Sequence, residues 1–245
     1  MLKYMGSKRR VAKELAAVLE GYRKPGQPFV SPFCGSCAVE MEMRPPVLAS
    51  DANPYLIALL TALRDGWVPP TEVSEDFYKD VRACKALYEP HLVGFVGFGC
   101  SFGGRWFEGY ARGKTKDGSP RNYAAEGSRG CTRDARRLKS IELWRAEYDE
   151  LELPERALIY CDPPYQGTKK YGVAPRFDHA AFWQWVRDRS AEGHTVLVSE
   201  YAAPEDFKMV WHKELNVNLN NHVAGVAGRA TEKLFKWNPF YQKPK

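Results

Sequence analysis

Long hydrophobic runs are missing from this chain. Nowhere in its 245 residues is there a stretch approaching the ~18 apolar residues that a membrane-spanning helix needs. The first residues also do not resemble a signal peptide, because the basic residues Lys3, Lys8, Arg9 and Arg10 are followed by an amphipathic stretch. We therefore expect a soluble, intracellular protein that has no membrane partner.

The chain also lacks the patterns of metal, disulfide and nicotinamide sites. Its six cysteines fit reduced, buried thiols, and the Cys34-x-x-Cys37 pair has no second pair at zinc-binding spacing. The five histidines are scattered, so we expect no metal. Residues 31–37 contain a single glycine and do not supply the Gly-x-Gly-x-x-Gly turn of a nicotinamide oxidoreductase.

Excess positive charge is confined to one segment. Residues 101–145 hold 11 Lys and Arg against 5 Asp and Glu, whereas the rest of the chain holds 25 of each sign. The segment is also rich in glycine and aromatic residues, a combination typical of a nucleic-acid-binding surface. A solvated insertion is the alternative. The candidate nucleic-acid-binding residues here are Arg105, Arg112, Arg133, Arg136 and Arg137.

Short apolar strands alternate with helices on both sides of this segment. The predicted strands are 29–30, 47–50, 141–144, 158–161 and 194–199, and the predicted helices are 7–22, 36–43, 55–64 and 177–192. Strands at 207–215 and 232–237 would form a late hairpin. This order predicts an α/β fold with a Rossmann-like, doubly wound sheet, made from residues 1–68 and 141–245. Residues 69–140 form an insertion, helical at 72–92, irregular at 93–130 and helical again at 132–140.

The fourth apolar strand ends abruptly in Asp162-Pro163-Pro164-Tyr165. The carboxyl end of a strand is where ligands bind in open α/β sheets. The Asp162 carboxylate and the Pro163 carbonyl could accept hydrogen bonds from an exocyclic base amine, and Tyr165 could stack on the base. Such acceptors favour methylation of the amine, although an ordinary Asp-Pro-Pro turn is the alternative.

Three further segments favour a nucleotide-like ligand. Gly35 and Ser36 follow the first strand, where the backbone could approach a ligand and Ser36 could cap a helix. Asp51 ends the second strand, where an acidic residue commonly binds ribose hydroxyls, or it caps the helix after Asn53. Residues 4–8 combine an aromatic ring, a glycine turn and Lys8, or simply begin a capped helix.

Together, residues 3–8, 32–36, 51–57 and 162–165 resemble the motifs of the DNA adenine methyltransferases related to the bacterial GATC-methylating enzyme, including phage members. The resemblance implies S-adenosyl-L-methionine as cofactor and residues 69–140 as the target-recognition region. The cofactor residues that it implies are Tyr4, Lys8, Pro32, Phe33, Gly35, Ser36, Asp51, Asn53 and Asp162. The catalytic residues that it implies are Asp162, Pro163 and Tyr165. Two positions depart from the pattern: Ser31 stands where the family usually has Glu, and Cys37 replaces a small residue.

The resemblance implies transfer of a methyl group to the 6-amino group of an adenine flipped out of double-stranded DNA. A loop at 166–176 would then close over the base, with Lys169, Lys170 and Arg176 near the phosphates. The alternatives are methylation of cytosine at N4 and a catalytically silent DNA-binding protein. RNA or a protein amide fits less well as substrate. We expect a bacterial or phage-infected cytoplasm and a possible restriction-modification partner, with the recognised site and oligomeric state left open.

Overall fold

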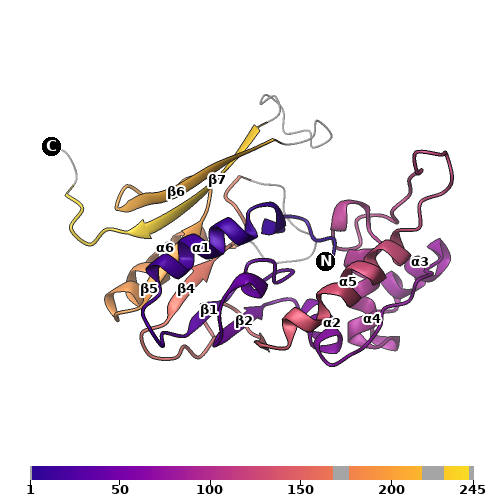
Figure 1. Cartoon of the computed structure of the whole chain (residues 1–245), viewed down its shortest axis with the longest axis horizontal. Coiled ribbons are helices and arrows are strands. Elements are labelled where there is room, and N and C mark those ends of the chain that lie inside the picture. The colour runs from indigo at the N-terminus through magenta and orange to yellow at the C-terminus, as the bar shows by residue number, and fades with distance from the viewer. Residues whose placement is uncertain (1, 168–176, 217–228, 243–245) are drawn as a thin grey trace.

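The described residues, 2–167, 177–216 and 229–242 of a computed structural model, form one sheet of seven strands in the order β3-β2-β1-β4-β5-β7-β6 (Figure 1). The strands are β1 (Phe29–Ser31), β2 (Val47–Asp51), β3 (Ile141–Arg145), β4 (Leu158–Cys161), β5 (Thr195–Ser199), β6 (Phe207–Asn216) and β7 (Arg229–Trp237). Strands β1 to β5 are parallel, and β7 is antiparallel to both neighbours. The predicted strands and late hairpin are therefore confirmed, in a mixed rather than wholly parallel sheet.

Helices cover both faces of the sheet, as a doubly wound fold requires. Side chains of β4 alternate between the faces. Leu158 and Tyr160 pack in the cluster that contains α1 (Ala12–Tyr22) and α2 (Pro54–Arg64). Ile159 and Cys161 pack in the cluster that contains α6 (His179–Ala191). The predicted α/β fold is thus confirmed, and β4 is buried on both sides, as its unbroken apolar sequence indicated.

The insertion is mainly helical and gathers beside α2 at one end of the molecule (Figure 1). Its helices are α3 (Glu75–Ala83), α4 (Pro90–Gly94) and α5 (Tyr123–Leu138), with a π-helical turn at Phe95–Gly99 and 3-10 turns at Lys85–Leu87 and Phe102–Gly104. Buried side chains from all three helices belong to the same core cluster as α1 and α2. The insertion therefore shares its hydrophobic core with one face of the sheet.

Two predicted helix starts are wrong. Residues 36–43 do not form a helix but a series of turns ending in a 3-10 turn at Glu40–Glu42, because Gly35 and Cys37 both have positive φ angles, 49° and 55°. Ser36 therefore caps no helix there. Ser7 makes no capping hydrogen bond either, and a 3-10 turn, Lys8–Arg10, precedes α1. The two serine hydroxyls instead bond to each other at 2.9 Å.

Predicted boundaries in the insertion also change. The expected helix at 72–92 is divided into α3, a 3-10 turn and the start of α4. The expected irregular stretch at 93–130 contains the first half of α5, which begins at Tyr123 because the Asn122 side chain caps it by accepting from Ala125 N at 2.8 Å. The helix expected only from 132 is thus the end of a longer one.

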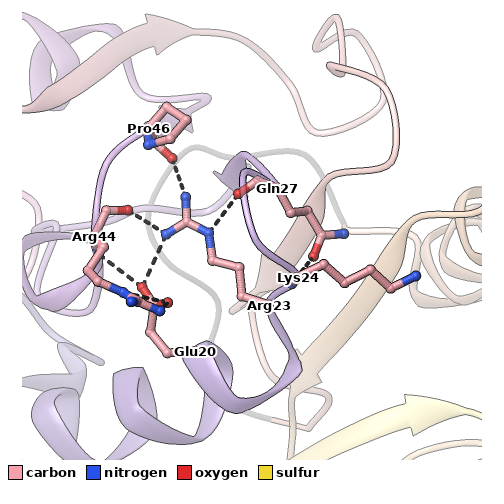
Figure 2. A network of polar contacts seen from close by, with 6 residues as sticks. All are labelled: Glu20, Arg23, Lys24, Gln27, Arg44 and Pro46. Atoms are coloured by element: carbon pink, nitrogen blue, oxygen red, sulfur yellow. Dashed lines mark hydrogen bonds and ion pairs between the residues drawn. The ribbon is translucent and has the colours of Figure 1, made fainter.

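A polar network joins the end of α1 to the amino ends of β1 and β2 (Figure 2). The Arg23 guanidinium donates to the carbonyl of Gln27 at 2.7 Å, to that of Pro46 at 2.9 Å and to that of Arg44. It also pairs with Glu20 at 3.1 Å. Since the Arg23 side chain is only 6% exposed, these backbone acceptors depend on it.

Replacing Arg23 with alanine is expected to lower the free energy of unfolding by about 2–3 kcal/mol, because the carbonyls of Gln27, Arg44 and Pro46 lose a charged donor that they share. Urea unfolding followed by circular dichroism measures the change. Arg44→Ala is the matched control, since that side chain is 77% exposed and shares the Glu20 partner. An equal loss in both variants would contradict a structural role specific to Arg23.

Candidate active site

The order of the strands places a crevice between β1 and β4. Strands β2 and β3 follow β1 on one side, whereas β5 follows β4 on the other. In open α/β sheets, ligands bind outside the carboxyl ends of the strands where the order reverses in this way. Ser31 ends β1 and leads into the turn at 32–35, and Asp162 directly follows β4. The two motifs predicted from the sequence therefore meet at this crevice.

Asp162 pairs with a lysine from the other end of the chain. Lys8 Nζ lies 2.9 Å from Asp162 Oδ1 and 3.6 Å from Glu232 Oε2 of β7. Lys8 is almost fully buried, with 7% of its side chain exposed, while Asp162 keeps 19%. One cation is therefore shared by two carboxylates, and Asp162 remains reachable from the crevice.

The pKa shifts follow from this arrangement. Burial alone would lower the pKa of Lys8, but the charges of Asp162 and Glu232 outweigh it and hold that pKa above its usual value. Burial raises the pKa of Asp162, and the nearby Lys8 ammonium offsets this only in part. Lys8 is thus a permanent positive charge, while Asp162 binds a proton more readily than an exposed aspartate.

Tyr165 lies over the same cluster. Its hydroxyl donates to Glu232 Oε2 at 3.1 Å, and Lys8 Nζ lies 4.7 Å from its ring centroid. Tyr201 packs edge-on against the ring, with the centroids 4.6 Å apart. The adjacent Glu200 accepts the backbone N–H of Gln166 at 2.6 Å and so fixes the end of the Asp-Pro-Pro-Tyr turn.

Asp51 organises the neighbouring part of the crevice. Its Oδ2 accepts from Gly35 N at 3.1 Å, and its Oδ1 accepts from Asn53 N at 2.9 Å. Burial raises the pKa of Asp51 to about 6, although these two hydrogen bonds act to lower it. The side chain of Asn53, not of Asp51, caps α2 by accepting from Tyr55 N and Leu56 N. Asp51 therefore ties the β1 turn to the start of α2.

Gly35 is required where it stands. An added Cβ would lie 2.9 Å from the Tyr4 ring, in addition to the positive φ. Tyr4 thus packs directly on the β1 turn. Pro32 is buried, while Phe33 turns to the other face of the sheet, where its ring contacts Tyr148 and Phe182. The structure thus brings together all the predicted cofactor residues except Phe33, whose ring belongs to the α6 core.

Sequence reasoning missed four acidic or aromatic residues near Asp162: Glu40, Glu200, Tyr201 and Glu232. Glu200 directly follows β5, so the strand-end pattern that identified Asp51 and Asp162 could have found it. Glu232 lies within β7, and Glu40 lies in a turn where a helix was expected. No local pattern marks these two.

The predicted nucleic-acid-binding residues are in different environments. Arg112 pairs with Glu75, and Arg105 lies beside Met5 and Glu108. Arg136 is exposed on α5. Arg133 and Arg137 line a cleft between α5 and the start of α1, whose other basic residues are Arg9, Arg10, Lys13 and Lys213. Lys169, Lys170 and Arg176 lie outside the described residues.

The described part of the chain contains neither a candidate membrane-spanning helix nor a candidate metal-binding cluster. No helix there combines the length and apolar character needed to cross a membrane. No group of three or more His, Cys, Asp or Glu side chains in residues 2–167, 177–216 and 229–242 could hold a metal ion.

The fold and the crevice define an α/β enzyme of the nucleotide-binding type, with an acidic centre at the end of β4. Within that class, the family model of the D12 class N6 adenine-specific DNA methyltransferases matches residues 4–91 of the chain. Such an enzyme transfers the methyl group of S-adenosyl-L-methionine to adenine in DNA, which confirms the expected activity and cofactor over the cytosine and silent alternatives.

A curated relative agrees with this assignment. The chain is 29% identical over 227 residues to the retron Ec67 DNA adenine methylase of Escherichia coli, covering 81% of this chain and 76% of that protein. Among solved structures, yhhF of Escherichia coli, described as a candidate methyltransferase, has a TM-score of 0.39 at 10% identity over 97% of this chain and 90% of that one. SMU.472, described as a candidate methyltransferase complexed with SAH, has a TM-score of 0.37 at 11% identity over 98% of this chain and 55% of that one. These two likenesses are too distant to add to the assignment.

Proposed function

We propose that Asp162 and the Pro163 carbonyl receive the 6-amino group of an adenine flipped out of double-stranded DNA. The observation that supports this most directly is the position of Asp162, which is exposed to the crevice at the β1–β4 switch point and backed by a buried cation. The roles proposed for the other residues depend on their distance from this carboxylate.

The residues around the crevice fit S-adenosyl-L-methionine. The buried hydroxyl of Ser50, next to the last residue of β2, has no hydrogen-bond partner among the described residues. Unsatisfied polar groups of this kind are costly unless a ligand or water binds them. Asp51 is placed to accept the ribose hydroxyls, while Tyr4 and the backbone of Gly35 line the part next to Asp162. The cofactor, when bound, supplies an electrophilic methyl group on a sulfonium.

The reaction then depends on how charge is held around the target amine. Hydrogen bonds from the amine to Asp162 and to the Pro163 carbonyl direct its lone pair toward the methyl group and stabilise the positive charge that develops on nitrogen. Asp162 can next take the proton that the methylated amine releases, since burial raises its pKa. Lys8 keeps the carboxylate oriented, and Tyr165, whose hydroxyl donates to Glu232, can stack on the base.

Residues 69–140 are proposed to recognise the DNA site, and the basic cleft beside α5 to follow the phosphate backbone. Changing Arg133 and Arg136 to glutamine should weaken DNA binding and lower the log–log salt slope by about 2. Fluorescence anisotropy over a series of salt concentrations measures the slope. Changing Lys24 and Arg44, which lie near the amino ends of β1 and β2, is the charge-matched control. If both pairs alter the slope equally, α5 is not the phosphate contact.

One experiment tests the proposed substrate. The protein is incubated with isotope-labelled S-adenosyl-L-methionine and a pool of random-sequence duplexes, and the DNA is digested to nucleosides and sequenced around the modified base. N6-methyladenine within one sequence context is expected. Modification of single strands only, or of another base, would contradict the proposal. A nuclease partner would be recognised by its failure to cut DNA methylated in this way.

A further inference from the structure

Glu40 is a buried carboxylate without a cation. It lies in the 3-10 turn after β1 and is only 2% exposed. Among the described residues, no lysine, arginine or histidine forms an ion pair with it, whereas the next acidic residue, Glu42, pairs with Arg137 at 2.7 Å. Burying an ionised carboxylate without a compensating charge is strongly unfavourable.

The groups around Glu40 do not supply that charge. The buried Ser31 hydroxyl is close enough to donate to the Glu40 carboxylate, which also accepts from the backbone N–H groups of Val39 and of Glu40 itself. The negative charge of Asp162, at the end of β4, adds to the effect of burial on the pKa of Glu40. Burial is also the main cause that raises the pKa values of Cys37 and Tyr160, and the charge of Glu40 adds to both shifts. These neighbours are neutral or negative. Burial raises the pKa of Glu40 to about 7. The end of β1 is therefore a buried region of negative potential.

We propose that Glu40, together with the Ser31 hydroxyl, binds the α-ammonium group in the methionine part of the cofactor. This inference rests on the proposed cofactor pocket. An ammonium group would supply the positive charge that the buried Glu40 carboxylate lacks among the described residues, beside the Ser31 hydroxyl at the end of β1.

The proposal explains the departure at Ser31. A glutamate at that position would place its carboxylate at the end of β1, and here a serine stands instead. The turns that contain Gly35 and Cys37 lead to Glu40, whose carboxylate contacts the Ser31 hydroxyl at the end of β1. A carboxylate contributed from further along the chain thus takes the place of one contributed by the strand itself.

Calorimetry with two ligands tests this. S-adenosyl-homocysteine carries the ammonium group but no sulfonium, and 5′-deoxy-5′-methylthioadenosine carries the nucleoside but no amino acid. Glu40→Gln should weaken the binding of S-adenosyl-homocysteine about 10- to 100-fold, as expected for losing a charge-assisted hydrogen bond. The same substitution should leave the affinity for methylthioadenosine unchanged within about two-fold, because the nucleoside does not reach Glu40. Glu42→Gln is the matched control and should alter neither affinity.

The outcomes separate the inference from the proposed function. Unchanged S-adenosyl-homocysteine affinity in Glu40→Gln, or equal weakening of both ligands, would overturn the role of Glu40 while leaving the cofactor pocket in place. Weakening of S-adenosyl-L-methionine alone would assign Glu40 to the sulfonium instead. If the wild-type protein binds neither ligand, the proposed cofactor pocket is wrong.

Two further measurements exclude a folding defect. Glu40→Gln replaces a buried, unpaired carboxylate with a neutral amide, so the melting temperature of the ligand-free protein at pH 8 should not fall. Wild-type affinity for S-adenosyl-homocysteine should decrease as pH falls below about 7, where free Glu40 takes up a proton. This decrease should be smaller in Glu40→Gln, in which Asp51, with a pKa of about 6, and Asp162 are the remaining carboxyl groups. A lower melting temperature or an unchanged pH profile would contradict the proposal.

Discussion

Replacing Asp162 with alanine is expected to reduce methyl transfer on the order of 100-fold or more while the protein stays folded. The carboxylate is the group at the end of β4 that is both reachable from the crevice and able to accept a hydrogen bond and a proton. Its loss leaves Lys8 paired with Glu232 at 3.6 Å, so no unpaired buried cation results. The rate of methyl transfer to duplex DNA at saturating cofactor measures the effect.

Two controls make the result specific to chemistry. Asp162→Asn keeps an acceptor oxygen in the same place but cannot take a proton at neutral pH, so an intermediate loss is expected. Affinity for S-adenosyl-homocysteine should change little in either variant, because Asp51 and the β1 turn remain. Turnover of Asp162→Ala within a few-fold of wild type would show that another group holds the amine.

The position of Asp162 could be predicted because it depends on local sequence. An apolar run that ends in Asp-Pro-Pro has to be a buried strand with a carboxylate at its end. The parallel order of β1, β2 and β4 then brings Asp51, Gly35 and Asp162 to one edge of the sheet. The same rule applied to β5 would have found Glu200, which lies in the turn beside Tyr165.

The charges around Asp162 could not be predicted in this way. Lys8 comes from the first turn of the chain and Glu232 from its last strand, and only the closed fold brings them within ion-pair distance of each other. Glu40 was hidden by the expected helix at 36–43, since a sequence pattern does not report that Cys37 adopts a positive φ. Residues that act through long-range pairing leave no periodic signal.

The insertion shows a related limit. Gly127 and Gly130 disfavour a helix because glycine has a low helix propensity, so only the basic end of α5 was expected. Gly127 packs closely there, since an added Cβ would lie 3.3 Å from the Phe95 ring. Tertiary contact between α5 and the π-helical turn thus outweighs the helix propensity of the sequence.

Replacing Lys8 with methionine is expected to lower the free energy of unfolding at pH 8 by about 3–5 kcal/mol, the usual cost of removing one partner from a buried ion pair. Methionine keeps the length and apolar stem of lysine, so the change isolates the charge. Without Lys8, the carboxylates of Asp162 and Glu232 face each other inside the protein. Urea unfolding at pH 8 and pH 5 measures the loss.

The sign of the pH dependence separates charge from packing. Asp162 already has a raised pKa, and removing the Lys8 ammonium raises it further. A carboxyl group whose pKa is higher in the folded than in the unfolded state destabilises the fold fully above the folded pKa, and the penalty shrinks as pH falls toward the unfolded value. The loss caused by Lys8→Met should therefore be smaller at pH 5 than at pH 8.

A second substitution should reverse part of the effect. Adding Glu232→Gln to Lys8→Met removes one of the two opposed carboxylates, so the double variant should be more stable than Lys8→Met alone. Lys213→Met, which breaks a partly exposed pair with Glu14, is the matched control and should cost less. If Lys8→Met costs no more than Lys213→Met, or costs the same at both pH values, then Lys8 contributes packing at this site and the shared charge between β4 and β7 is not what holds Asp162 in place.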